Sequence, residues 1–326
     1  MIHFNSNTQT FNLLLKSSFY AFQVDQQKRL VHLAWGPRPE HANEDDVITT
    51  GHTSDLTFSP HELRQHPRRD ELLAFGDASQ QEVSLKVSFP SLPATIETHE
   101  ASHLPIRDVR LRYTGHEIDT NSEPGLSPTH GLPVRNTGPR ETLRVCMQDP
   151  VQPFKLVLCY RLTPEHDIIE RWCELENLGQ EPVILEVCGF GTLHLPNGTN
   201  ELTTVSGVWG REFITQRQRL QMGTHIFESR SLQTGHLFNP FFLINRPHQA
   251  WEESGTVYFG ALAYSGSWRL TIEQVPTFDV RIHGGYNPFD FELTLTPQER
   301  HVTPALVCGV SNNGWGGASR RLHALA

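Results

Sequence analysis

Carboxylate side chains are the first candidates for chemistry in this sequence, because two of them on a rigid scaffold can cleave a glycosidic bond. The chain holds 36 acidic residues, so their number alone selects none. Asp290 lies in a turn, Glu273 within an alternating run, and Glu252 and Glu253 in a polar loop. None shows the strand-end loop and second carboxylate expected of a catalytic pair. The competing interpretation of Asp290 is a turn cap that accepts hydrogen bonds from nearby backbone N–H groups.

Histidines are the next candidates, because the chain has 18 of them. His52, His61 and His66 fall in one polar stretch, and His225 and His236 fall in a later loop. No H-x-H, H-E-x-x-H or Cys/His ladder is present, so we expect surface or hydrogen-bonded histidines and no metal site. The sequence also lacks G-x-S-x-G and a phosphate-binding glycine loop, so no cofactor is expected.

Tryptophans at turns could bind sugars by stacking, because the C–H face of a pyranose fits an aromatic surface. Trp35, Trp209 and Trp315 lie at or near expected turns, where we expect them to be exposed. The competing interpretation is packing within or between sheets, which is the usual place of such side chains.

The elements that must position these residues are strands, because period-two alternation dominates the chain. An apolar face alternating with a polar face is typical of antiparallel sheets. The expected strands are 30–35, 83–89, 154–162, 168–177, 183–188, 257–264, 268–274 and 291–295.

Turn residues separate these runs at short intervals, and helical stretches are few, at 60–63 and 316–323. The pattern predicts an all-β fold, a large antiparallel β-supersandwich with few helices. Residues 37–78 are polar and alternate little, so we interpret them as a long excursion from the sandwich. Loops of that length are more often functional than idle.

Composition excludes several classes of protein. The formal net charge of −9 argues against nucleic-acid binding, which needs basic side chains for the phosphates. No apolar run approaches the ~20 residues of a membrane span, and the first residues lack the features of a signal peptide. Five cysteines without a C-x-x-C spacing indicate free thiols in a reducing cytoplasm.

Taken in order, a set of motifs resembles the N-terminal region of family 36 glycoside hydrolases, the bacterial and fungal α-galactosidases. The resemblance is most specific between 175 and 323, and it is collinear but weaker upstream. The motifs are VWGRE (208–212), LQMG (220–223), ESR (228–230), HLFNPF (236–241), GTVYFG (255–260), YSGSW (264–268) and GGYNPFDF (284–291).

The resemblance implies a β-supersandwich over residues 1–318, with 319–326 starting a linker to a (β/α)8 catalytic barrel that the chain lacks. In the family the barrel carries both catalytic carboxylates of a retaining mechanism, so no catalytic residue is expected here. The resemblance also implies a homo-oligomer, with Trp35, Asp55 and Asp77 as candidates for the substrate rim or the interface. The family's arginine after the motif at 75–77 is absent here.

These considerations predict a non-catalytic domain of an α-galactosidase-like hydrolase. Its partners would be a barrel, in cis or on a second chain, and through the complete enzyme an α-galactoside sugar. The chain would lie in the cytoplasm and bind neither nucleic acid nor membrane. Two alternatives stay open. The first is a stand-alone carbohydrate-binding β-sandwich module, and the second is an enzyme with its own pair of carboxylates on the sandwich.

Overall fold

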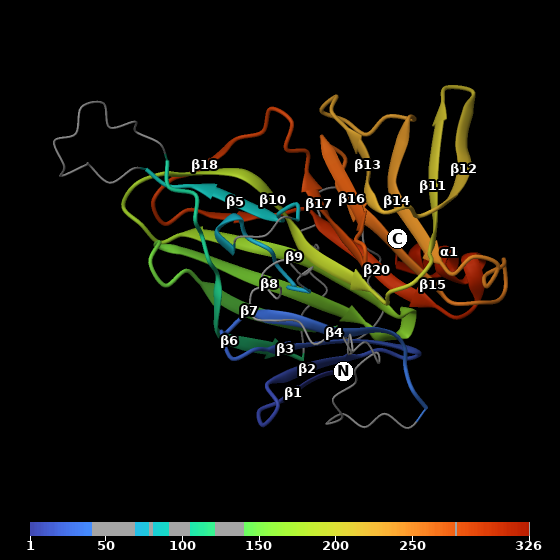
Figure 1. Cartoon of the computed structure of the whole chain (residues 1–326), viewed down its shortest axis with the longest axis horizontal. Coiled ribbons are helices and arrows are strands. Elements are labelled where there is room, and N and C mark those ends of the chain that lie inside the picture. Colours follow the sequence, from blue (N-terminus) through green and yellow to red (C-terminus); the bar gives the residue numbers. More distant parts are fainter. Residues whose placement is uncertain (41–68, 78–80, 91–104, 121–139, 278, 326) are drawn as a thin grey trace.

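The computed structural model describes residues 1–40, 69–77, 81–90, 105–120, 140–277 and 279–325. Across these ranges the chain forms three antiparallel sheets and one α-helix (Figure 1). The prediction of a large all-β, antiparallel β-supersandwich with few helices is therefore confirmed. Within the same ranges, no helix combines the length and the apolar character that crossing a membrane requires.

A four-stranded sheet is formed by the N-terminal meander β1 (Ile2–Asn5), β2 (Thr10–Leu14), β3 (Ser18–Val24) and β4 (Leu30–Pro37). A six-stranded sheet has the order β13-β16-β17-β10-β18, with β5 also paired to β10. Its strands are β5 (Leu85–Ser88), β10 (Val183–Leu195), β13 (Gly223–Ser229), β16 (Trp268–Gln274), β17 (Val280–Tyr286) and β18 (Leu293–Leu295).

The largest sheet has ten strands in the order β12-β11-β14-β15-β20-β9-β8-β7-β6, with β19 also paired to β9. Five of its strands are β6 (Arg112–Asp119), β7 (Glu141–Gln148), β8 (Phe154–Thr163), β9 (Ile168–Asn177) and β11 (Glu201–Val208). The others are β12 (Arg211–Arg219), β14 (Phe238–Asn245), β15 (Val257–Ala263), β19 (Arg300–Val302) and β20 (Ala305–Ser311).

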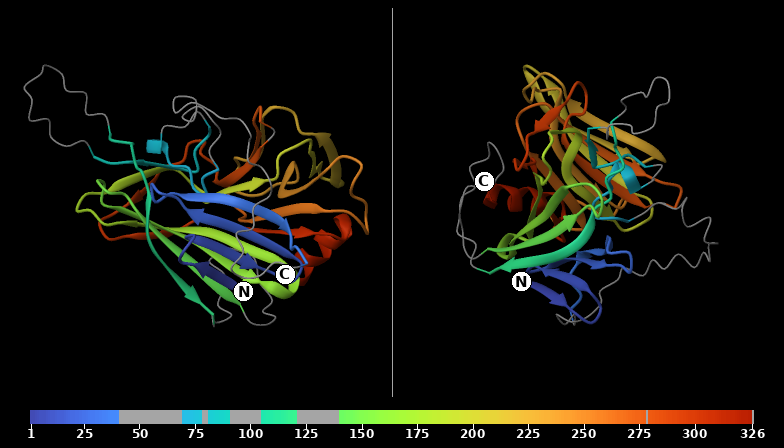
Figure 2. Two further views of the ribbon diagram at one scale, coloured as in Figure 1. Left: turned by 60° about the horizontal axis from the view of Figure 1, so that its bottom comes forward. Right: turned by 90° about the vertical axis from the view of Figure 1, so that its left-hand side faces the viewer.

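One face of the ten-stranded sheet carries the main core. In β8 the alternating residues Leu156, Leu158, Tyr160 and Leu162 are all buried in this core, whereas Cys159 belongs to a separate cluster. The same core contains residues of the four-stranded and six-stranded sheets, which together cover that face (Figure 2). Alternation thus places one set of side chains between the layers, as the sequence pattern requires.

The helix α1 (Gly314–Leu325) packs on β15 and β20 through a second cluster that includes Ala318 and Leu325. This confirms the helix expected at 316–323, while the stretch 60–63 lies outside the described residues. The loop between β14 and β15 accepts two N–H groups of the first turn of α1, from Trp315 to Trp251 O and from Gly316 to Glu252 O, both at 2.9 Å. These bonds satisfy donors that a helix start leaves without intrahelical partners.

Candidate functional site

Of the three residues proposed for a rim or an interface, the structure describes Trp35 and Asp77. Trp35 is 0% exposed, so the expectation that it is exposed near a turn is wrong. It lies on β4 between the rings of Tyr20 and Tyr258, whose centroids are 5.9 Å and 5.1 Å from its own. Burial among aromatic rings gives Trp35 the packing role that was the competing interpretation.

Asp77 ends a short 3-10 helix, η2 (Phe75–Asp77), and its side chain is only 6% exposed. Arg112 Nη1 donates a hydrogen bond to Asp77 Oδ1 at 3.2 Å, which fixes the end of this segment against β6. Asp55, the third residue proposed for the rim or the interface, lies outside the described residues.

The other two tryptophans differ in what surrounds them. Trp209 is 87% exposed in the turn between β11 and β12. Trp315 is half-buried, donates from Nε1 to Asn245 Oδ1 at 3.1 Å, and is covered by the Arg217 guanidinium 3.6 Å from its ring centroid. Only Trp209 therefore has the exposure that was expected of all three.

The turn around Asp290 is capped by a different residue from the one expected. The Oδ1 atom of Asn287 accepts the Phe289 N–H at 3.0 Å, whereas Asp290 is exposed and has a left-handed φ of 52°. In the polar loop, Glu253 forms an ion pair with Arg320 of α1 at 2.9 Å. In the described ranges, no group of three or more His, Cys, Asp or Glu side chains could hold a metal ion.

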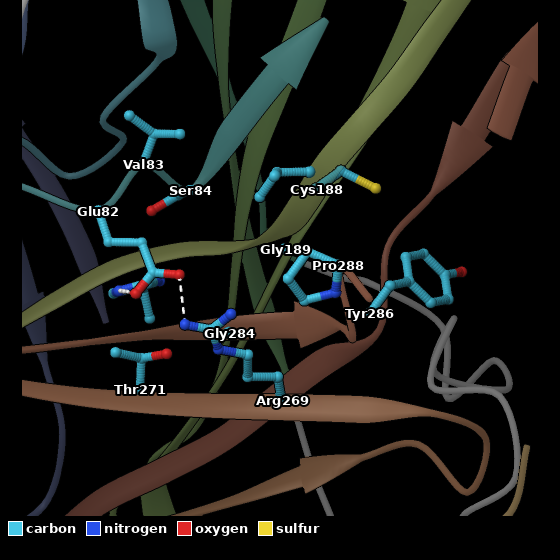
Figure 3. A pocket seen from close by; sticks show the side chains of 12 residues that line it. Glu82, Val83, Ser84, Cys188, Gly189, Arg269, Thr271, Gly284, Tyr286 and Pro288 are labelled. Atoms are coloured by element: carbon cyan, nitrogen blue, oxygen red, sulfur yellow. Dashed lines mark ion pairs between the residues drawn. The ribbon is translucent and has the colours of Figure 1, made fainter. Parts of the chain in front are cut away.

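A small pocket lies where the segment before β5 meets β16 and β17 (Figure 3). Its polar lining comes from Glu82, Ser84, Arg269, Thr271 and His283. The Glu82 carboxylate forms an ion pair with the Arg269 guanidinium at 2.6 Å, drawn as a dashed line in Figure 3. Burial raises the pKa of Glu82, although the charge of Arg269 opposes that change.

The size of this pocket limits its chemistry. Its volume is about 20 Å³, the space of one water-sized group, and ligand pockets usually have ~300–1,000 Å³. The second carboxylate nearby, Glu273, is held by Arg281 at 2.6 Å. Two carboxylates that are each paired with an arginine, beside a cavity too small for a sugar ring, do not form the pair a glycosidase uses.

A buried ionic cluster lies deeper, between all three sheets. Glu71 precedes η2 and accepts hydrogen bonds from Tyr20 OH at 2.8 Å and Tyr160 OH at 2.6 Å. His32 Nδ1 lies 3.1 Å from Glu71 Oε1, and Arg171 Nη1 lies 3.0 Å from Glu71 Oε2. Burial by itself raises the pKa of a carboxyl, but the positive charge of Arg171 and these hydrogen bonds outweigh it and lower the pKa of Glu71.

This cluster continues into the six-stranded sheet. Arg171 Nη1 donates to Thr192 O at 2.8 Å, and His194 Nε2 lies 3.0 Å from Asp70 O. The sequence pattern does not predict the cluster, because Glu71 stands in a polar stretch and Arg171 in an ordinary alternating strand. The one signal was an arginine on the face of β9 that alternation assigns to the core.

Known proteins resemble this chain in both sequence and fold. The model of the glycosyl hydrolase family 36 N-terminal domain matches residues 28–296. The α-galactosidase AgaA of Geobacillus stearothermophilus is 27% identical over 336 residues, which cover 99% of this chain and 43% of that protein.

Solved structures show the same fold. The crystal structure of the α-galactosidase AgaB of Geobacillus stearothermophilus superposes with a TM-score of 0.82 at 27% identity, covering all of this chain and 43% of that one. A structure of AgaA in complex with raffinose superposes with a TM-score of 0.80 at 26% identity, covering 97% of this chain and 42% of that one. The chain therefore spans less than half the length of these relatives.

Proposed function

Because this chain belongs to the family of glycosyl hydrolase family 36 N-terminal domains, we propose that it acts as the non-catalytic domain of an α-galactosidase-like hydrolase. The complete enzyme would hydrolyse terminal α-D-galactosides with retention of configuration. Support for the substrate class comes from relatives named α-galactosidases, one of which was crystallised with raffinose.

Two observations support the non-catalytic assignment. This chain matches only 43% of AgaB, and the two carboxylates at the small pocket, Glu82 and Glu273, are each paired with an arginine. The division into a sandwich over 1–318 and a linker from 319 to a (β/α)8 barrel is part of the proposal. The barrel would be in cis or on a second chain.

The domain would pack against the barrel, assemble a homo-oligomer and contribute to the rim of the active site. Arg112 holds Asp77, which supports a fixed position for the segment that ends at Asp77. A rim contact from Asp77 or Asp55 is part of the proposal. Because Trp35 is fully buried, it would affect such a contact only indirectly, through its packing in the core. The cysteines in the described ranges are free thiols, which supports a cytoplasmic location.

Hydrolysis of p-nitrophenyl-α-D-galactoside tests the proposal. The purified chain is assayed alone and after mixing with a folded barrel fragment of a family 36 enzyme, and light scattering gives the mass of each species. We expect no activity from the chain alone, and a gain in activity when a complex forms. Activity of the chain alone would overturn the non-catalytic assignment, and a barrel that gains nothing from the chain would overturn the assembly role.

A further inference from the structure

A second and larger cleft lies between three loops of the six-stranded sheet and its neighbours. The loops join β13 to β14, β15 to β16 and β17 to β18 (Figure 1). The cleft has a volume of about 510 Å³, within the ~300–1,000 Å³ typical of small-molecule sites. The lining residues that matter below are Arg230, Leu232, Tyr264, Tyr286, Phe289 and Asp290.

Hydrogen bonds tie the three loops into one rigid frame. The Asn287 side chain donates to Glu228 Oε2 and Ser229 O, both at 3.0 Å, and its backbone N–H donates to Ser267 O at 3.0 Å. Leu232 N–H donates to Ser267 Oγ at 2.9 Å. The walls of the cleft are therefore held in place without any ligand, which lowers the entropic cost of binding.

The floor of the cleft is aromatic. The ring of Tyr286 stacks on Phe291 with centroids 5.1 Å apart and an interplanar angle of 15°, and it meets Tyr264 edge-on at 5.1 Å and 88°. Phe289 stands at the mouth, 62% exposed, with the Arg230 guanidinium 4.6 Å from its ring centroid. Rings packed against one another at fixed angles offer flat apolar surface that does not collapse.

Two residues at the cleft hold a backbone conformation that non-glycine residues rarely adopt. Leu232 has a φ of 61° and Asp290 a φ of 52°. Leu232 is also 86% exposed, so its apolar side chain gains nothing by burial within the chain. A strained backbone that presents an apolar side chain to solvent is a cost to folding, and such strain is concentrated at binding sites.

We propose that this cleft binds a neutral sugar ring. The flat aromatic floor matches the C–H face of a pyranose, and the Asp290 carboxylate and the Tyr264 hydroxyl can bond its hydroxyl groups. The Tyr286 hydroxyl lies 3.1 Å from His301 Nε2, and it can still accept a hydrogen bond from a ligand. The charge of Arg230 is offset by its ion pair with Glu228 at 2.5 Å, and the carboxylate of Asp290 also lines the cleft, so the site favours no charged ligand. Residues of this chain alone line the site, which goes beyond the proposed function.

Saturation-transfer NMR and calorimetry on the full chain test the site with three probes. These are methyl α-D-galactopyranoside, methyl α-D-glucopyranoside and the acyclic polyol sorbitol. We expect at least one pyranoside to bind with a dissociation constant of ~1 mM or below, equivalent to about −4 kcal/mol. Sorbitol has comparable hydroxyls but no ring to stack, so we expect it not to bind. Absence of pyranoside binding, or equal binding of sorbitol, overturns the proposal.

Variants locate the binding. Phe289→Ala removes the ring at the mouth and should weaken pyranoside binding roughly three- to tenfold. Asp290→Asn should also weaken it, and asparagine tolerates the left-handed backbone there. Phe213→Ala is the matched control, because Phe213 is 74% exposed on β12 and does not line the cleft. A loss of affinity in the control equal to that of Phe289→Ala would place the site elsewhere and overturn this assignment.

Discussion

The guanidinium of Arg171 and the carboxylate of Glu71 form an ion pair at 3.0 Å with both side chains fully shielded from solvent. Arg171 also donates to the backbone oxygen of Glu71 itself. Because Arg171 lies on β9 and Glu71 lies outside the regular strands, the pair fastens the segment 69–77 to the core of the sandwich. A buried charge of this kind is tolerated only where its partner is present.

Removal of one member of this pair should therefore be costly. We expect Glu71→Gln to lower the free energy of unfolding by about 3–5 kcal/mol, because it leaves the Arg171 charge buried without a counter-ion. Urea denaturation monitored by circular dichroism measures the change. Glu253→Gln breaks the exposed pair with Arg320 and should change little. A Glu71→Gln protein as stable as the parent would show that the pair contributes nothing.

The buried histidines predict a loss of stability in weak acid. Burial lowers the pKa of His194 and His283 well below the value of 6.5 that they have in the unfolded chain. Below pH 6.5 the unfolded chain therefore binds protons that the folded chain does not, so stability decreases as the pH falls. The slope is at most about 1.4 kcal/mol per pH unit for each histidine.

Urea denaturation at pH 7.5 and pH 5.5 measures this dependence. His283→Gln should reduce the difference in free energy between the two pH values, because glutamine does not titrate. If the parent and His283→Gln proteins lose equal stability between these values, His283 is not a source of the dependence.

Trp35 should behave as a core residue. We expect Trp35→Ala to lower the free energy of unfolding by about 3–5 kcal/mol, because it removes a fully buried ring and leaves a cavity beside Tyr20 and Tyr258. Trp209→Ala, at a position 87% exposed, should leave stability near that of the parent. A stable Trp35→Ala protein would contradict the packing role.

Gly284 lies so close to the backbone of the adjacent strand that a larger side chain should be destabilising. A Cβ atom at this position would lie 2.3 Å from the backbone oxygen of Arg269 on the adjacent strand β16. We expect Gly284→Ala to lower the free energy of unfolding by about 1–3 kcal/mol, because a backbone oxygen cannot rotate away from the new methyl group as a side chain could. Gly115→Ala on β6 meets nothing within 4 Å and serves as the control. Equal midpoints in urea for the two variants would contradict the expectation.

The strands with strict alternation could be predicted from the sequence. The run 154–162 became β8 and the run 168–177 became β9, because side chains on successive residues face opposite sides of a strand. The run 291–295 shortened to β18 at Leu293–Leu295, and the ring of Phe291 stacks on Tyr286 just before the strand begins. Local patterns set the existence of a strand better than its ends.

The ionic cluster and the aromatic cleft could not be predicted in this way. Tyr264 and Tyr286 are 22 positions apart in the sequence, yet their ring centroids are 5.1 Å apart. Glu71 and Arg171 are separated by 100 positions. Such pairs depend on how the sheets stack, and no local pattern of residues encodes that arrangement. For Trp35 the local sequence suggested a turn, and the packing of β4 decided its burial.

The ionic cluster also constrains the route by which the chain folds. Its hydrogen bond from Arg171 to Tyr20 spans 151 positions, and the one from Tyr160 to Glu71 spans 89. Loops of these lengths must close before the pairs can form, and chains dominated by distant pairings fold slowly. Until Glu71 is in place, the guanidinium of Arg171 must stay hydrated, so the layers cannot exclude water and pack around it. We therefore expect final desolvation of the interior to depend on the docking of one short segment, late in folding.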